Sequence, residues 1–172
     1  MDLKKYVREV ENFPIEGIHF KDITTILQDA DAYNYTIDLI SSSLEGLDYD
    51  VIVAPEARGF LFATPVAYKN KKSFVPIRKK GKLPYKTVQY TYELEYGEDM
   101  IEMHIDGVKK GQKVVVIDDL LATGGTVNAI CKLLEQQGAQ VVKLVFVIEL
   151  EFINPIDDIK KYDRYSIIKY NE

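Results

Sequence analysis

The sequence predicts an α/β protein in which helices flank a mostly parallel sheet. Two strand–turn–helix–strand units indicate this fold, one in residues 51–77 and the other in residues 114–148. Their strands are apolar without alternation, which is typical of strands that helices cover on both faces. The chain has 172 residues, of which 47% are apolar and 28% charged, so we expect residues 1–172 to form one domain with a sizeable core.

Composition and charge narrow the class of protein. The formal net charge of −5 creates no overall field that would attract a polyanion, so neither a nucleic acid nor a membrane is an expected partner. One cysteine allows no internal disulfide and no cysteine cluster for zinc. The N-terminus lacks the apolar core of a signal peptide, and no apolar run approaches the roughly 18 residues of a membrane helix. We therefore expect a cytoplasmic protein.

Two helices are expected before residue 50. The first has apolar residues at helical spacing, namely Leu3, Tyr6, Val7 and Val10. It should stop before Pro14, because the residue before a proline leaves helical geometry. The second follows Asp31, with Asp29 or Asp31 as its cap. Its apolar face consists of Tyr33, Ile37, Ile40 and Leu44. Residues 13–27, between the helices, form an apolar loop that should cover another part of the molecule.

The first βαβ unit contains a strand at 51–54, a helix at 59–69 and a strand at 73–77. Residues 86–105 then alternate between apolar and polar side chains on both sides of Gly97. Alternation of this kind predicts an antiparallel hairpin that could act as a flap.

The second unit opens with a strand at 114–118 and returns along a strand at 141–148. Its helix should end at Gly138 and bury one stripe of side chains, made of Val127, Ile130, Cys131 and Leu134. No neighbour of Cys131 would lower its pKa, so we interpret it as a core residue. The last apolar stretch, 164–170, is expected to be an edge strand.

The strongest chemical signal lies where strand 114–118 meets its helix, in the stretch DDLLATGGT (118–126). Small residues there let backbone N–H groups converge on a phosphate at the positive end of the helix dipole. Asp118 and Asp119 would repel each other in a purely structural turn, and only one of them could cap the helix. The stretch lacks the motifs of ATPases and of dinucleotide-binding folds. A phosphate beside two carboxylates suits ribose 5-phosphate, whose 2- and 3-hydroxyls the carboxylates would bind.

The stretch VVVIDDLLATGGT (114–126) resembles the phosphoribosyl diphosphate (PRPP) motif of type I phosphoribosyltransferases. Four further stretches resemble the adenine phosphoribosyltransferase family in the same order and at similar spacing: 13–24, 54–63, 75–84 and 92–104. The resemblance implies the type I phosphoribosyltransferase fold, with an N-terminal hood at about 12–28 and a flap at about 82–105. It also implies a purine-salvage reaction, in which the phosphoribosyl group of PRPP passes to N9 of adenine and gives AMP and diphosphate.

The resemblance assigns roles in PRPP binding. Asp118 and Asp119 would hold the ribose and place negative charge near the sugar as it becomes cationic. The 5-phosphate would lie on the phosphate turn, which consists of Ala122, Thr123, Gly124, Gly125 and Thr126. The diphosphate would lie at Glu56, Ala57 and Arg58. Magnesium would be held mainly by PRPP and water, with no direct protein ligand.

A basic cluster follows strand 73–77 and consists of Arg78, Lys79, Lys80 and Lys82. It is either a solvated loop or a means of capturing the PRPP anion, for which we single out Arg78, Lys79 and Lys82. In the family, the residues that match Arg78 and Lys82 can reach the diphosphate of the neighbouring subunit. The resemblance therefore implies a homodimer.

The adenine site would be formed by the hood and the flap. Phe20 would stack on the base, unless it is a core residue, and the backbone of His19 and Lys21 would bind the purine edge. The His19 side chain adds a contact or does nothing. Glu95 and Tyr96 would close over the base from the flap, with Glu95 exchanging a proton at N7 as a general acid/base. The alternative is that Glu95 is an exposed flap residue.

Two other functions remain as alternatives. A phosphoribosyltransferase for hypoxanthine or xanthine would share the PRPP motif, but the hood and the stretch EARGF (56–60) argue against it. A transcriptional regulator that binds PRPP as a signal would be expected to carry a DNA-binding segment and a basic face, which an acidic chain does not favour.

Overall fold

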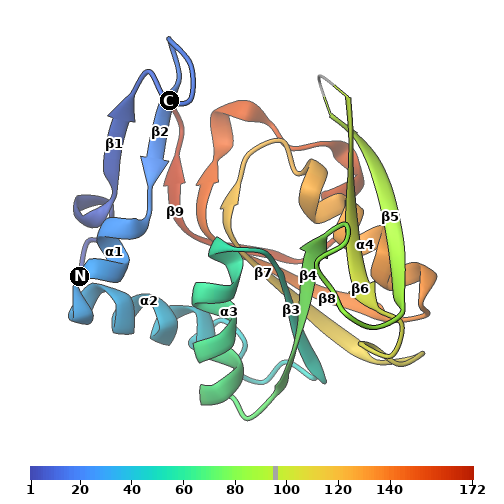
Figure 1. Ribbon diagram of the computed structural model, residues 1–172. Coiled ribbons are helices and arrows are strands. Elements are labelled where there is room, and N and C mark those ends of the chain that lie inside the picture. The colour runs from blue at the N-terminus through green and yellow to red at the C-terminus, as the bar shows by residue number, and fades with distance from the viewer. Residues whose placement is uncertain (95–96) are drawn as a thin grey trace.

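The computed structural model describes residues 1–94 and 97–172 and has a seven-stranded sheet with the order β5-β6-β4-β3-β7-β8-β9 (Figure 1). Its parallel strands are β3 (Val51–Pro55), β4 (Ser73–Lys79), β7 (Lys113–Leu121), β8 (Gln140–Leu150) and β9 (Arg164–Tyr170). The flap supplies two antiparallel strands, β5 (Thr87–Leu94) and β6 (Gly97–His104). The predicted fold class, the flap hairpin and the edge position of the last strand are confirmed.

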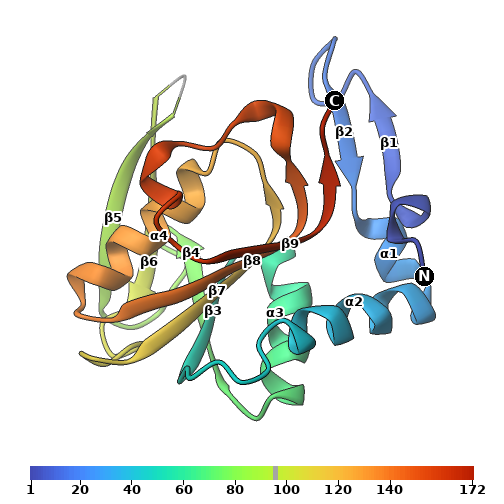
Figure 2. The same ribbon diagram turned by 180° about the vertical axis from the view of Figure 1, so that it is seen from behind.

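Helices cover both faces of this sheet, as Figures 1 and 2 show from opposite sides. Helices α2 (Ala30–Ser42) and α3 (Arg58–Lys69) pack on one face, and α4 (Gly125–Gln136) packs on the other. Successive strand residues point to opposite faces, so Ile52 joins the first core cluster while Val51 joins the second. Burial on both faces explains why these strands are apolar throughout.

The prediction of a helix over residues 3–10 is wrong. A 3₁₀ helix, η1 (Leu3–Tyr6), is followed by strand β1 (Arg8–Glu11), which pairs antiparallel with β2 (His19–Asp22). Val10 lies opposite Phe20 in this two-stranded hairpin. An isolated short helix is marginal, and pairing with a strand about ten residues away satisfies the backbone better.

The stretch predicted as an apolar loop is therefore more regular than expected. It supplies β2 and then the short helix α1 (Thr24–Gln28), whose start is held by Asp22, since its Oδ1 accepts a bond from the Thr24 N–H at 2.9 Å. Asp29 caps α2 as predicted, with Oδ1 accepting from the Ala32 N–H at 2.8 Å.

Two short 3₁₀ helices, η2 (Glu151–Ile153) and η3 (Asp157–Ile159), lie between β8 and β9. They pass beside the start of α4, where Ile156 and Ile159 contact the phosphate turn. None of the helices in the described part of the chain is long and apolar enough to span a membrane.

Candidate active site

The main cavity, of about 270 Å³, lies at the carboxyl ends of β3 and β7. Ligands in sheets of this kind bind beyond the carboxyl ends of the strands. Most predicted PRPP residues line this cavity: Glu56, Ala57, Arg58, Arg78, Lys79, Asp118, Asp119, Ala122, Thr123, Gly124, Gly125 and Thr126. The folded chain thus brings together groups from three separate stretches of sequence.

The two aspartates occupy different environments although they are adjacent. Asp119 is 5% exposed, and its Oδ2 lies 2.7 Å from Nε of Arg58. Asp118 accepts the backbone N–H of Asp119 at 2.8 Å. Burial and the nearby Asp119 carboxylate raise the pKa of Asp118 well above its ordinary value. The pair therefore concentrates negative charge, which Arg58 partly offsets.

Glycine at position 59 makes room for the first aspartate. A Cβ on Gly59 would lie 3.0 Å from Oδ1 of Asp118 and 3.1 Å from the Pro55 ring. Gly59 follows Arg58, the first residue of α3, so the tight approach of α3 to β7 sets the position of both charged groups. A larger residue at 59 would displace the Asp118 carboxylate.

The phosphate turn is anchored from below by the chain that follows β8. Gly124 has φ = +84°, a left-handed conformation that favours glycine. A Cβ there would lie 2.8 Å from Cδ1 of buried Ile159. The N–H of Ile156 donates to the Thr123 carbonyl at 2.9 Å. These contacts fix the turn at the start of α4, where the helix dipole favours an anion, and leave Thr123 and Thr126 exposed.

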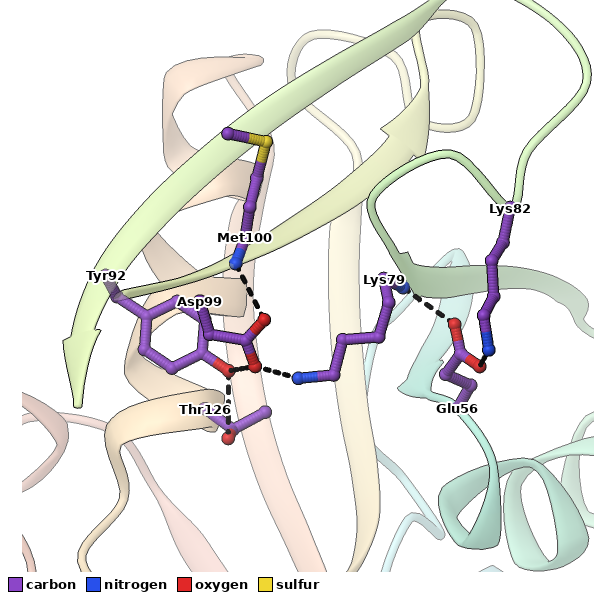
Figure 3. Close-up of polar contacts among 7 residues, drawn as sticks. All are labelled: Glu56, Lys79, Lys82, Tyr92, Asp99, Met100 and Thr126. Atoms are coloured by element: carbon purple, nitrogen blue, oxygen red, sulfur yellow. Dashed lines mark hydrogen bonds and ion pairs between the residues drawn. The ribbon is translucent and has the colours of Figure 1, made fainter. Parts of the chain in front are cut away.

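Glu56 organises the basic cluster (Figure 3). Its Oε1 accepts the Lys79 N–H at 2.7 Å and lies 3.4 Å from Nε of Arg78, while its Oε2 lies 2.9 Å from Nζ of Lys82. Burial opposes ionisation, but the hydrogen bonds from Lys82 and Lys79 and the nearby charge of Arg78 prevail and lower the pKa of Glu56 to about 2. Glu56 is thus a stable anion that holds the cluster beside the cavity.

The hood meets this site through one aromatic residue. The Arg58 guanidinium lies 5.4 Å from the centre of the Phe20 ring, and Phe13 packs edge-on against that ring at 5.2 Å. Phe20 is half-buried, so the alternative that it belongs to the core is wrong. Arg58 therefore contacts both the aspartate pair and the aromatic ring predicted to stack on the base.

His19 and Lys21 lie on the other side of the hood strand. Their side chains pair with Glu9 of β1, with His19 Nδ1 at 3.0 Å from Oε1. Both residues line a second cavity, the hood cavity, of about 560 Å³. Its apolar wall includes Leu150, the last residue of β8, and Phe152 and Ile153, which lie in η2. The predicted adenine residues are thus divided between two adjoining surfaces, with the backbone of β2 between them.

The structure separates some predicted residues and adds others. Lys82 does not line the main cavity but reaches it through Glu56, and Glu95 and Tyr96 lie outside the described residues. Tyr92 and Asp99 were not predicted, yet they form a polar group that joins Lys79 to Thr126 (Figure 3). They face each other only once β5 and β6 pair. The sequence feature that could have indicated Tyr92 is its alternation with Tyr90 along one face of the strand.

The fold and cavity define an α/β protein that binds a sugar phosphate: an anion site at a helix start, two carboxylates for hydroxyl groups, and several cations. The phosphoribosyl transferase domain matches residues 18–168 of the chain. A relative from Clostridium acetobutylicum, an adenine phosphoribosyltransferase, is 57% identical over 171 residues, covering 99% of each chain. This chain belongs to the phosphoribosyltransferase family and, within it, to the adenine phosphoribosyltransferases.

Solved structures agree with this assignment. The adenine phosphoribosyltransferase of Thermoanaerobacter pseudethanolicus superposes with a TM-score of 0.95 at 51% identity, covering 98% of each chain. The Saccharomyces cerevisiae enzyme has a TM-score of 0.90 at 35% identity, covering 96% of each chain, and was crystallised with adenine and an imino-altritol bisphosphate. Both similarities extend over nearly the whole chain.

Proposed function

We propose that this protein transfers the 5-phosphoribosyl group from PRPP to N9 of adenine, giving AMP and diphosphate. One observation carries the proposal most directly: the Asp118–Asp119 pair, the phosphate turn and the basic residues Arg58, Arg78 and Lys79 line one cavity. That arrangement matches a ligand with a phosphate at one end, hydroxyls in the middle and a diphosphate at the other end. The purine-salvage reaction follows from family membership.

The aspartates act on the sugar. Asp118 and Asp119 accept bonds from the ribose hydroxyls and stabilise the positive charge that develops on the ring as the bond to diphosphate breaks. The raised pKa of Asp118 reflects an anion that is poorly compensated in the free protein. A cationic sugar would supply the missing charge, so this interaction strengthens in the transition state.

The cations act on the leaving group. Arg58 and the backbone of Glu56 and Ala57 would hold the diphosphate at the end of β3, and Lys79, Arg78 and Lys82 surround the same region. The 5-phosphate would be held by Ala122–Thr126. Together these contacts orient the ribose so that its anomeric carbon faces the hood.

Magnesium is proposed as the cofactor, bound through the substrate. In the described residues, 1–94 and 97–172, no cluster of three or more histidines, cysteines and carboxylates could form a protein-only metal site. The proposed cation would be held mainly by PRPP oxygens and water. When bound, it would neutralise charge on the departing diphosphate.

The base would be held by the hood. Phe20 lies next to Arg58 and can stack on a purine, while the backbone of His19 and Lys21 would bind its edge. We propose that Glu95 handles the proton at N7 and that Tyr96 closes over the base, as the family match of this stretch implies. Closure would also exclude water from PRPP.

The domain organisation and the cellular location are also part of the proposal. We propose that residues 1–172 act as a single domain, with the hood at about 12–28 and the flap at about 82–105, and that the protein is cytoplasmic. Its one cysteine, Cys131, is free and fully buried, which is compatible with a reducing compartment.

We further propose a homodimer in which Arg78 and Lys82 reach the diphosphate of the partner. Mixing two variants of low activity tests this idea, namely Asp119→Asn and the double variant Arg78→Ala/Lys82→Ala. Heterodimers would combine intact aspartates with intact basic residues from the other subunit, so activity should reappear on mixing. If the mixture stays inactive although subunits exchange, the basic residues act within their own subunit.

The decisive experiment measures AMP formation from labelled adenine, PRPP and magnesium, with hypoxanthine and guanine as competitors. Adenine offers an amino donor beside the N1 acceptor, whereas hypoxanthine reverses both, and a backbone N–H and C=O cannot exchange their roles. Two mismatches at about 1 to 3 kcal/mol each predict a preference for adenine of about 30- to 25,000-fold in kcat/KM. Values within tenfold would instead indicate a transferase for another purine, and PRPP binding without turnover would indicate a regulator.

A further inference from the structure

The flap carries a polar pair that is not part of the cavity wall. Tyr92 on β5 lies directly opposite Asp99 on β6, and its hydroxyl is 3.1 Å from Oδ2 of Asp99. Oδ2 also accepts the ammonium group of Lys79. On the other side, the Tyr92 hydroxyl lies 3.4 Å from Oγ1 of Thr126 (Figure 3). The pair therefore connects a residue of the basic cluster with a residue of the phosphate turn.

The number of protons available decides which group donates in each of these hydrogen bonds. An ionised carboxylate only accepts, so the single proton of the Tyr92 hydroxyl is directed to Asp99. The Thr126 hydroxyl must then be the donor in the contact with Tyr92. Asp99 is fixed in turn, because its Oδ1 accepts the Met100 N–H at 2.9 Å. Lys79, Tyr92 and the Met100 N–H thus donate to Asp99, the single anion of the group, while Thr126 donates to Tyr92.

The contact with Thr126 suits an exchange with substrate. A separation of 3.4 Å is long for an O–H···O bond, so this link is weak. A phosphate on the turn would offer the Thr126 hydroxyl a shorter, charge-assisted bond. The Tyr92 oxygen thus keeps the hydroxyl near the site while the site is free, at little cost when phosphate arrives.

The ring and the hydroxyl of Tyr92 have separable roles. Tyr92 packs against the core cluster around α4 together with Val88 and Tyr90, which lie on the same strand face. The hydroxyl of Tyr90 makes no hydrogen bond to any residue within 1–94 or 97–172. Packing of this face on α4 therefore does not require a hydroxyl, and the one on Tyr92 needs another explanation.

We propose that Tyr92 and Asp99 are positioning residues for PRPP. They hold Thr126 and Lys79, which line the main cavity from α4 and β4, at the separation that the two anionic ends of PRPP require. Neither residue lines the cavity itself, so they act through Thr126 and Lys79. This inference rests on the proposed function, because it takes PRPP as the ligand.

The test is Tyr92→Phe, with Tyr90→Phe as the matched control. Loss of one hydroxyl that orients a phosphate ligand should raise the KM for PRPP about 3- to 10-fold. The kcat and the KM for adenine should stay within about twofold, since the ring and the flap remain in place. Calorimetric titration with ribose 5-phosphate should show a weaker site in Tyr92→Phe and an unchanged site in Tyr90→Phe.

Repeating the substitution in a Thr126→Val variant tests whether the contact between Tyr92 and Thr126 is responsible. In Thr126→Val, which removes the hydroxyl but keeps the shape, Tyr92→Phe should change the KM for PRPP less than about twofold, because the contact is already lost. An equal effect in both backgrounds, or Tyr92→Phe behaving like Tyr90→Phe, would overturn the proposal. Should Tyr92→Phe unfold, Asp99→Asn serves the same comparison, since it keeps the side-chain shape and removes the charge.

Two measurements distinguish a wrong function for the protein from a wrong role for Tyr92. If the wild-type protein makes no AMP from adenine and PRPP, the proposed function is wrong. If the wild-type protein is active but the Tyr92 and Tyr90 variants are alike, only the role of Tyr92 is wrong.

Discussion

The phosphate turn and the hood, which we propose to bind the 5-phosphate and the base, are supported very differently by the rest of the molecule. The turn follows β7, whose residues Val114 to Ile117 are fully buried, and it precedes α4, which packs into the core. Ile156 and Ile159 support it from below. A phosphate therefore meets backbone groups that are already in place.

The first part of the hood, up to Asp22, belongs to the two-stranded β1–β2 hairpin at the edge of the molecule (Figure 1). Its tip is exposed and apolar, with Phe13 at 50% and Ile15 at 64% exposure. The described contacts that tie it to the rest are few, such as Phe20 against Arg58 and Lys21 over the Tyr170 ring. Isolated hairpins of this kind are marginally stable.

The difference in support suggests that the two regions bind their ligands in different ways. In the proposed function the sugar phosphate would bind a preorganised surface, which lowers the entropy cost of binding a flexible ligand. The base would bind a less supported element, whose exposed apolar surface a purine would cover. The predictions that follow test the two regions separately, starting with the largest effect.

Replacing either aspartate should cost the most activity. Asp118→Asn and Asp119→Asn should each lower kcat/KM for PRPP about 10- to 1,000-fold, because each removes negative charge that faces the cationic sugar. Steady-state kinetics with both substrates measures this, and binding of adenine should change much less. Unchanged kinetics in both variants would remove the pair from the sugar site.

The same two variants should differ in stability. Asp118 has a raised pKa, so its ionisation destabilises the folded protein above its ordinary pKa, and Asp118→Asn should raise the unfolding midpoint at pH 7. Asp119→Asn breaks the ion pair with Arg58 and should lower the midpoint. Thermal denaturation followed by circular dichroism distinguishes the two outcomes.

Gly124→Ala should break the preorganised turn. The new Cβ would need a left-handed backbone and would lie 2.8 Å from the Ile159 side chain, so we expect a loss of about 1 to 3 kcal/mol in stability. The KM for PRPP should rise by roughly tenfold or more as the N–H groups move. The control for stability is Gly125→Ala, where the nearest atom to a new Cβ is 3.8 Å away. Similar denaturation curves for both variants would contradict this account.

Phe20→Ala should affect the hood alone. Loss of stacking on the base should raise the KM for every purine about 5- to 30-fold, by analogy with base–aromatic stacking energies, while the affinity for PRPP remains near that of wild type. His19→Ala should keep the preference for adenine, because the proposed contact is made by the backbone. A variant of Phe20 that loses PRPP and adenine binding equally would show that the hood is not an independent element.

Acid denaturation should reveal the smallest effect, at Glu56. Its pKa is lowered to about 2, so its ion pairs stabilise the protein above the ordinary value of 4.5, and this contribution disappears as the pH falls from there toward 2. Glu56→Gln should therefore be less stable than wild type by about 1 to 3 kcal/mol at neutral pH, with the gap closing on acidification. A gap independent of pH would contradict the ionic role.

Sequence patterns predicted the sheet and its helices well because those patterns are local. Continuous apolar strands followed by small-residue turns fixed the positions of β3, β7 and β8 within a few residues. The first ten residues show where prediction from local patterns fails. Their helical spacing of Leu3, Tyr6 and Val7 describes only η1, since residues 8–11 pair with a strand that follows an intervening turn.

The candidate site shows the same division. The phosphate turn and its aspartates are consecutive in sequence, so their chemistry could be read directly. The partnership of Tyr92 with Thr126, or of Glu56 with Lys82, could not, because residues far apart in the chain meet only after β4, β5 and α4 have packed. For Glu95 and Tyr96 the predicted roles remain predictions.

The sequence by itself determined which groups this protein possesses: a phosphate-binding turn, a carboxylate pair, a basic cluster and an aromatic residue for the base. Tertiary structure decided how they are paired, for it set Arg58 between Asp119 and Phe20 and tied the basic cluster to Glu56. The reason is physical. Local propensity and periodicity act over one element, whereas distances between charged groups depend on how the sheet, its helices and the hood pack together.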